Sequence, residues 1–321
     1  MNRRTVVSRL ALASLVAGCK RIDVLNALVP SNDVSLTRDV AYGAEPRQRL
    51  DIYQPSGKGD ARPIVVFLYG GGWREGEKAD YPFVAEPLAR SGFVVVVPDY
   101  RLYPQVQFPV FVQDCAQAVA WSLAHAGSLG GHPAALSVVG HSAGAYNAAM
   151  LALDPAWLRE AGTSREALAS VVGLAGPYDF LPISDPDVIP IFASVGDGPA
   201  SQPISYVDGH NPPMLLLAGD ADTTVQPRNT SSLAARIHDA GGPVEAKLYP
   251  GIGHLGIIVA FAPVLKARAP VLADVATFVG RYRAASARAG TQTPSAQLLP
   301  TASPAPRGSV AHAQLPSLSG R

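Results

Sequence analysis

Clusters of basic residues are missing from nearly all of this sequence. Its 321 residues include 26 lysines and arginines against 25 aspartates and glutamates, which leaves a formal net charge of +1. No basic cluster lies beyond residue 21, so the positive surface on which nucleic-acid binding depends is lacking. We therefore expect no nucleic-acid partner.

Long apolar runs and internal repeats are lacking as well. After residue 19 no apolar stretch approaches the roughly 18 residues needed to span a bilayer, and no period indicates a repeat architecture. Hydrophobic residues make up 48% of the chain and charged residues 16%, a balance typical of a globular protein with a sizeable core. One domain of about 250 residues with tails is the first expectation.

Cysteine is scarce. The chain has only two, Cys19 and Cys115. Cys115 lies in an apolar pattern of helical spacing and has no partner for a structural disulfide, so we expect it to be a small buried hydrophobe. A catalytic cysteine at that position would need a neighbouring activating base, and the sequence offers no such signature.

The first nineteen residues have the pattern of an export signal. Arg3 and Arg4 form a basic start, Leu10–Val16 is apolar, and the small-residue stretch Val16-Ala17-Gly18 leads to Cys19. This stretch resembles a bacterial lipobox. The resemblance implies that Cys19 is acylated, becomes the mature N-terminus and tethers the protein to a membrane of the cell envelope, facing the periplasm or the exterior. An ordinary cleaved signal and a merely apolar N-terminus remain alternatives, and the paired arginines loosely resemble a twin-arginine signal.

Between the two ends of the chain, strand-like apolar runs alternate with helical patterns, which is typical of a mainly parallel sheet covered by helices on both faces. Strands are expected over residues 49–53, 64–68, 93–97, 136–139, 170–174, 214–218 and 244–248. Helices are expected over residues 80–90, 109–126, 143–153, 228–240 and 266–284.

The expected domain organisation has four parts. Residues 1–19 are the signal and lipobox, 20–33 a short spacer, 34–284 the catalytic domain, and 285–321 an Ala/Ser/Pro-rich tail with the composition of a disordered segment. Within the domain, residues 177–213 form a long irregular connection rich in proline and glycine. Such connections often carry binding, so this one is interpreted either as part of a substrate pocket or as an inert excursion.

One motif carries the chemistry. Gly140-His141-Ser142-Ala143-Gly144 follows a predicted strand and precedes an alanine-rich helical stretch. In this context a G-x-S-x-G sequence forms a tight strand-to-helix turn that exposes the serine hydroxyl. The flanking glycines avoid backbone clashes, and the following helix aims unpaired N–H groups at developing negative charge. The sequence therefore predicts that Ser142 is a nucleophile.

At this point the chain resembles the α/β-hydrolase superfamily, in particular its esterase and lipase branch, over roughly residues 40–284. Three further motifs occur in the family's order, namely Tyr69-Gly70-Gly71-Gly72-Trp73, Pro98-Asp99-Tyr100-Arg101-Leu102 and Gly219-Asp220-Ala221-Asp222-Thr223-Thr224-Val225. The resemblance implies the α/β-hydrolase fold, with a mainly parallel sheet of about eight strands. It also implies an oxyanion hole formed by the N–H groups of Gly71, Gly72 and Ala143.

One residue departs from the family pattern. Tyr69 stands where the family usually has histidine. Because the backbone of the loop carries the chemistry and this side chain supports it, we expect the oxyanion hole to be retained.

The family's chain order of serine, acid and histidine selects the general base. His254, in Gly251-Ile252-Gly253-His254, directly follows a strand-like run and is the expected base. The alternatives are less suited: His210 precedes the strand that should deliver the acid, His238 lies in a helical pattern, His312 lies in the tail, and His141 adjoins the nucleophile.

Two carboxylates, Asp220 and Asp222, follow the strand that should deliver the acid. The resemblance places the acid on Asp222, which leaves Asp220 to shape the turn or to cap the next segment. Asp99 and Arg101 are interpreted as a structural turn with an internal ion pair, because their strand precedes the nucleophile strand.

These residues predict a serine carboxylesterase that hydrolyses small or aryl esters through an acyl-enzyme, with a small-molecule ester as its partner and no metal or organic cofactor. An amide or formamide hydrolase of the same fold is the first alternative, because the fold alone does not choose between these reactions. A non-catalytic binding protein that keeps the hydrolase scaffold is the alternative from another class.

Overall fold

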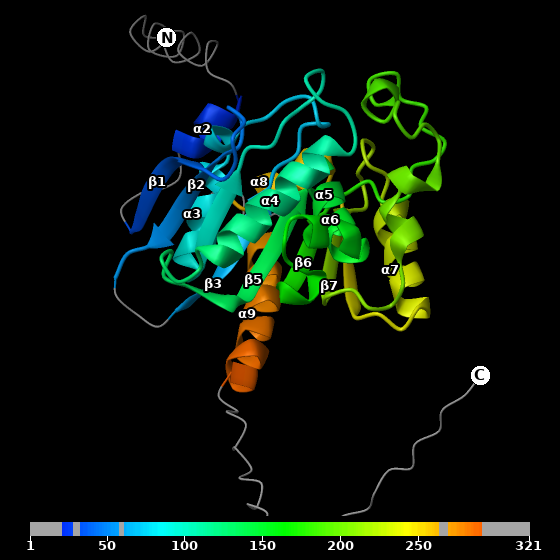
Figure 1. Ribbon diagram of the computed structural model, residues 1–321. Helices are drawn as coiled ribbons and strands as arrows, with labels where there is room; N and C mark the ends of the chain where they lie inside the picture. The colour runs from blue at the N-terminus through cyan, green and yellow to red at the C-terminus, as the bar shows by residue number, and fades with distance from the viewer. Residues whose placement is uncertain (1–20, 28–32, 58–60, 263–268, 291–321) are drawn as a thin grey trace, which may run out of the picture.

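The computed structural model describes residues 21–27, 33–57, 61–262 and 269–290 (Figure 1). The predicted signal and lipobox with Cys19, and most of the predicted tail, lie outside the described residues. No helix among the described residues is both long and apolar enough to cross a membrane.

An eight-stranded sheet organises the molecule, with strand order β1-β2-β4-β3-β5-β6-β7-β8. Strand β2 pairs antiparallel with β1 and β4, and the other neighbours pair in parallel. This confirms the expected α/β-hydrolase fold with about eight, mainly parallel strands. The strands are β1 Val34–Ala41, β2 Arg49–Pro55, β3 Arg62–Leu68, β4 Val94–Pro98, β5 Gly131–His141, β6 Leu168–Leu174, β7 Met214–Gly219 and β8 Val244–Tyr249.

Helices cover both faces of the sheet, as the alternating pattern predicts. Helices α4, α5 and α6 contact one another in front of the sheet in Figure 1, whereas α9 lies behind it and contacts α3. The helices are α2 Arg21–Ala27, α3 Pro82–Arg90, α4 Val110–Ala124, α5 Ala143–Leu153, α6 Pro155–Glu160, α7 Arg228–Asp239, α8 His254–Val259 and α9 Val271–Gly290.

The core lies around the central strands. All residues of β4 are buried, as are six of the seven residues of β3, because strands covered by helices on both faces exclude water from both sides. Cys115, on the inner side of α4, is fully buried and is a free thiol, which confirms the expectation of a small buried hydrophobe.

Several elements differ from the sequence expectations. Strand β1 was not predicted: its residues alternate between half-buried and exposed, and its pairing with β2 is irregular between Thr37 and Val40, so it lacks a continuous apolar run. Helix α2 lies within the segment expected to be a spacer, and α9 extends to Gly290, past the expected domain end at residue 284.

The expected ion pair between Asp99 and Arg101 was wrong. The Arg101 guanidinium donates from two nitrogens to the fully buried carboxylate of Asp114, each at 2.8 Å. Asp99 instead accepts from the Tyr69 hydroxyl at 2.7 Å and from the Lys78 amide at 2.7 Å. The two side chains therefore leave the same turn toward different partners, which their separation of two residues could not reveal.

Candidate active site

A sharp turn between β5 and α5 presents Ser142. The serine has φ 53° and ψ −121°, a left-handed backbone conformation that is rare for a residue with a side chain. Its own N–H donates to the carbonyl of Leu174 on β6 at 2.8 Å, which ties the turn to the neighbouring strand. A Cβ on Gly140 would collide with the backbone of Gly144 and Ala145, so the turn closes this tightly only with glycine.

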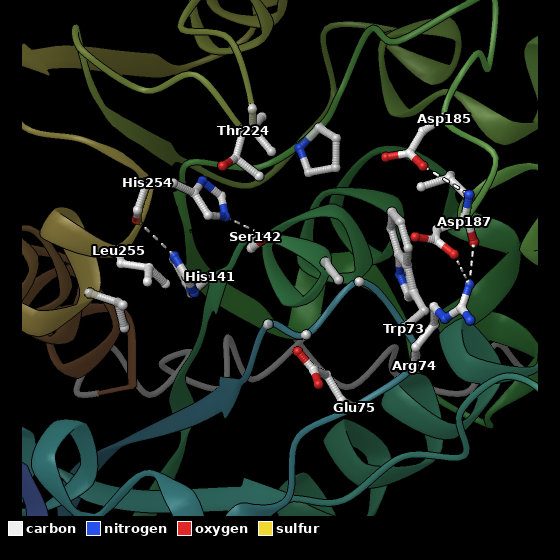
Figure 2. Close-up of a pocket in the computed structure, with 18 of the residues that line it drawn as sticks. Trp73, Arg74, Glu75, His141, Ser142, Asp185, Asp187, Thr224, His254 and Leu255 are labelled. Carbon is white, nitrogen blue, oxygen red and sulfur yellow. Dashed lines mark hydrogen bonds and ion pairs between the residues drawn. The ribbon is translucent and has the colours of Figure 1, made fainter. Parts of the chain in front are cut away.

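The structure brings Ser142 together with the expected base and acid, from three separate strand ends. His254 Nε2 lies 2.9 Å from Ser142 Oγ, and His254 Nδ1 lies 2.8 Å from Asp222 Oδ2 (Figure 2). Because a carboxylate can only accept, Nδ1 carries the imidazole proton, and Nε2 is left to accept the serine proton.

Asp222 is held rigidly behind the imidazole. Its side chain is fully buried, and its second oxygen, Oδ1, accepts from the amides of Thr224 and Val225, each at 2.9 Å. Asp220 accepts from the Gly251 amide at 2.6 Å, which links the end of β7 to the turn before His254. Asp220 therefore shapes the turn, as expected, and only Asp222 reaches the imidazole.

The other histidines lie elsewhere. His238 is 84% exposed on α7 beside Asp239, and His210 is exposed with its backbone N–H on Asp208. His312 lies outside the described residues. Neither His210 nor His238 is placed to accept a proton from Ser142.

The glycine-rich loop after β3 passes beside Ser142. Gly71 and Gly72 have φ of 125° and 58°. The Gly71 carbonyl accepts from the amides of Arg74 and Glu75 at 3.0 and 3.1 Å, which turns the loop back on itself. Within the described ranges, the N–H groups of Gly71, Gly72 and Ala143 have no acceptor, so they are free to donate to a ligand.

Two side chains hold this loop. The Tyr69 hydroxyl donates to Asp99 at 2.7 Å and accepts from Arg47 Nη2 at 3.0 Å, and burial raises the pKa of Tyr69 well above its ordinary value. The expectation that this side chain supports the loop is therefore confirmed. Trp73 donates from its indole to Asn147 of α5 at 3.2 Å, a link that the sequence did not reveal.

His141 has a structural place that the sequence reasoning missed. It is buried, its Nε2 lies 3.4 Å from the His254 carbonyl, and the two imidazole rings are 5.1 Å apart. Burial and the neighbouring His254 lower the pKa of His141 to about 3, so it is neutral near pH 7. A neutral ring can donate from Nε2 to the carbonyl and so fixes the backbone that carries His254.

A cavity of about 900 Å³ opens above Ser142. The irregular connection 177–213 supplies part of its wall, including Pro177, Phe180 and Ile183, which confirms the pocket interpretation over the inert excursion. Ile22 and Leu25 of α2 also line it, although the sequence suggested only a spacer there. Their spacing of three residues was the available signal, because it places both on one helical face.

The described residues contain no group of three or more His, Cys, Asp or Glu side chains that could hold a metal ion. The site's polar groups are instead a hydroxyl, an imidazole, a carboxylate and free amides.

Comparison with known proteins places these residues in a family. The family model described as BD-FAE matches residues 50–237, more than half of the chain. The chain belongs to the BD-FAE family. It thus lies in the esterase branch of the α/β hydrolases, as the sequence motifs indicated. The BD-FAE match begins within β2 and ends within α7, so it includes Ser142 and Asp222 but ends before His254.

Individual relatives and structures agree with this placement. A probable isoprenylcysteine alpha-carbonyl methylesterase of Arabidopsis thaliana is 28% identical over 69% of this chain and 51% of its own length. A kynurenine formamidase of Salmo salar is 34% identical over 45% of this chain and 47% of its own. This BD-FAE chain thus spans about half the length of these curated relatives.

Among solved structures, an esterase B from Lactobacillus rhamnosis inhibited by a tributyrin phosphonate superimposes with a TM-score of 0.73. The superposition covers 91% of this chain and 100% of that one at 20% identity, and it shows a shared fold.

Proposed function

We propose that this protein is a serine carboxylesterase that hydrolyses small-molecule esters through an acyl-enzyme. The main support is a continuous hydrogen-bonded chain from Ser142 through His254 to Asp222, with distances of 2.9 and 2.8 Å. This chain lies at a cavity and beside unpaired backbone amides. The methylesterase relative and the shared esterase fold support the same reaction class.

The proposed first step forms the acyl-enzyme. His254 Nε2 takes the proton of Ser142 as Oγ bonds to the ester's carbonyl carbon. The negative charge that develops on the carbonyl oxygen is stabilised by the N–H groups of Gly71, Gly72 and Ala143; in enzymes of this kind one such donor contributes about 3 to 4 kcal/mol to lowering the barrier. His254 then gives its proton to the departing alcohol oxygen, and the bond between that oxygen and the carbonyl carbon breaks.

The second step releases the acid. His254 removes a proton from a water molecule, the water oxygen attacks the acyl carbon, and the Ser142 oxygen leaves with the proton that His254 returns. Throughout both steps Asp222 stabilises the imidazolium and keeps the Nδ1 proton in place. Asp222 can do this without moving because two backbone amides already hold its other oxygen.

The test of the nucleophile compares Ser142→Ala with wild type in hydrolysis of p-nitrophenyl acetate. We expect a loss of at least about 10³-fold, because substitutions in a triad leave only oxyanion and binding effects. Ser128→Ala, at an exposed serine in the turn that precedes β5, at the opposite end of this strand from Ser142, is the matched control and keeps full activity. Activity of Ser142→Ala within severalfold of wild type excludes Ser142 as the nucleophile.

Two alternatives are separated by direct measurements. The formamidase relative makes an amide or formamide hydrolase the second candidate, and the ratio of kcat/KM for an N-formyl aromatic amide to that for an aryl acetate decides between them. A non-catalytic binding protein is distinguished by a fluorophosphonate probe, since a folded protein whose Ser142 stays unlabelled is not a serine hydrolase.

We also propose that the protein is a lipoprotein of the cell envelope, acylated on Cys19. The basic start, the apolar stretch and the small residues before this cysteine support the proposal. Wild type expressed in a bacterium is expected to partition into Triton X-114 detergent, whereas Cys19→Ser remains in the aqueous phase. The proposal is overturned if the intact mass of the detergent-extracted protein shows no attached lipid.

A further inference from the structure

The cavity above Ser142 is lined by both charged and apolar side chains. Figure 2 shows Leu255 and His141 on one side of Ser142, and Arg74 and Asp187 on the other. Arg74 Nη1 pairs with Asp187 Oδ1 at 2.9 Å, and both side chains are exposed to solvent. Three helices supply one part of the apolar lining, namely Ile22 and Leu25 of α2, Phe83 of α3, and Leu255, Ile258 and Val259 of α8. Other apolar side chains, among them Trp73, Phe180 and Ile183, line the rest of the cavity.

Helix α2 is docked onto the domain by specific hydrogen bonds. Asn26 Nδ2 donates to the Asp80 carbonyl at 3.1 Å, and the amide of Phe83 donates to Asn26 Oδ1 at 3.1 Å. The second bond satisfies an otherwise unpaired N–H in the first turn of α3. Since a helix of seven residues is not stable alone in water, these contacts and the packing of Ile22 and Leu25 against the core fix its position.

The apolar side chains of this wall are incompletely covered. Ile22 and Leu25 are only half-buried, and Leu255 is 68% exposed at the cavity, which makes it the most exposed of the large apolar side chains among the described residues. An apolar ligand group placed in the cavity would remove this surface from water, with a favourable contribution from each methylene. These exposed apolar side chains could therefore be covered by an apolar group of the substrate.

We propose that α2, through Ile22 and Leu25, forms an apolar subsite that selects esters with an extended apolar arm. This inference rests on the proposed esterase function and adds the substrate class to it. Helix α2 lies outside residues 50–237, so the subsite is built by a part of the chain that the family match does not cover.

The experiment measures chain-length preference in the full chain. Wild type, the double variant Ile22→Ala/Leu25→Ala, and Leu25→Trp are compared on p-nitrophenyl esters from acetate to decanoate and on acetate esters of alcohols from methanol to octanol. Leu248→Ala, on the edge strand β8 and away from the cavity, is the matched control for truncating an exposed leucine.

In wild type, kcat/KM is expected to rise with arm length in one of the two series. In the double variant, the ratio of kcat/KM for the longest arm to kcat/KM for the shortest arm is expected to fall about tenfold, because the lost contacts touch only the extended arm. Leu25→Trp is expected to penalise long arms by obstruction. Leu248→Ala keeps the wild-type preference.

The two proposals fail in different ways. If wild type takes up a fluorophosphonate on Ser142 and hydrolyses short esters, but the chain-length ratio is the same in wild type, the double variant and Leu25→Trp, the subsite is overturned and the esterase stands. If wild type hydrolyses no ester in either series, the proposed function fails and the subsite falls with it. Should the double variant not fold, Leu25→Trp alone decides.

Discussion

Gly144 determines how closely the nucleophile turn approaches the glycine-rich loop, and replacing it with alanine is a sharp test of the proposed site. A Cβ at position 144 would lie 2.5 Å from the carbonyl carbon of Leu68 and closer still to its oxygen and to that of Tyr69. Real Cβ atoms essentially never approach other atoms within 3.0 Å. These carbonyls belong to the end of β3 and cannot rotate away as a side chain could.

The substitution therefore forces the turn and the loop apart by roughly 0.5 to 1 Å. Ser142 and Ala143 would shift with the turn, while Gly71 and Gly72 stay with the loop. Donors must lie about 2.7 to 3.1 Å from the developing oxyanion, and a misplacement of about 1 Å can cost on the order of 10²-fold in rate. We expect kcat/KM of Gly144→Ala to fall about 10²-fold.

Stability should change much less than activity. Alanine is favoured over glycine within a helix by about 1 kcal/mol, whereas forcing an extra carbon into a packed site costs about 1 to 3 kcal/mol. The opposing effects leave a net loss of about 1 kcal/mol in the free energy of unfolding, so most molecules stay folded at 25 °C.

The assay is p-nitrophenyl ester hydrolysis normalised to folded protein, with urea unfolding measured in parallel. Gly127→Ala, where an added Cβ meets nothing within 4 Å, is the control and should retain activity. A Gly144→Ala protein with kcat/KM within threefold of wild type refutes the reasoning, because the site would then tolerate the displacement.

Substitutions at Asp222, His141 and Tyr69 test three particular contacts. Asp222→Asn should reduce kcat by about 10³- to 10⁴-fold, measured with a p-nitrophenyl ester, because an amide donor facing His254 favours the wrong tautomer. His141 has an ordinary pKa of 6.5 and a folded pKa of about 3. The unfolded chain therefore binds a proton there first as the pH falls below 6.5, and stability is lost in that range. Urea unfolding from pH 7 to pH 4 should show a steeper decline for wild type than for His141→Gln, by about 1 kcal/mol per pH unit. Tyr69→Phe should lower the free energy of unfolding by about 1 to 3 kcal/mol, because it removes the hydroxyl that donates to Asp99.

Each of these has a contrary outcome. Asp222→Asn with more than a tenth of wild-type kcat removes Asp222 from the proposed triad, and Asp220→Asn is its control. If the stability of wild type and of His141→Gln declines in parallel between pH 7 and pH 4, folding does not lower the pKa of His141. If Tyr69→Phe unfolds at the wild-type urea concentration, the hydroxyl does not support the loop.

Local patterns predicted the parts of the fold with strong periodicity or turn chemistry. The apolar run ending at Pro98 predicted β4, and the G-x-S-x-G between a strand and a helix predicted the turn at Ser142. Strand β1 was not predicted because it is stabilised by pairing with β2 and not by an apolar run of its own. Helix α2 was not predicted because a helix of seven residues is marginal on its own and depends on its contacts with Asp80 and with Phe83 of α3.

The sequence by itself determined which residues carry chemistry and in what order they follow strands, since glycine spacing, strand runs and the serine turn are local properties of the chain. The family resemblance already selected Asp222 over Asp220, whereas only the tertiary structure decided that His141 holds the His254 backbone. It also decided that Arg101 pairs with Asp114 and that α2 walls the cavity. These contacts join residues far apart in sequence or choose between near neighbours, and side-chain direction at that scale is set by packing in three dimensions.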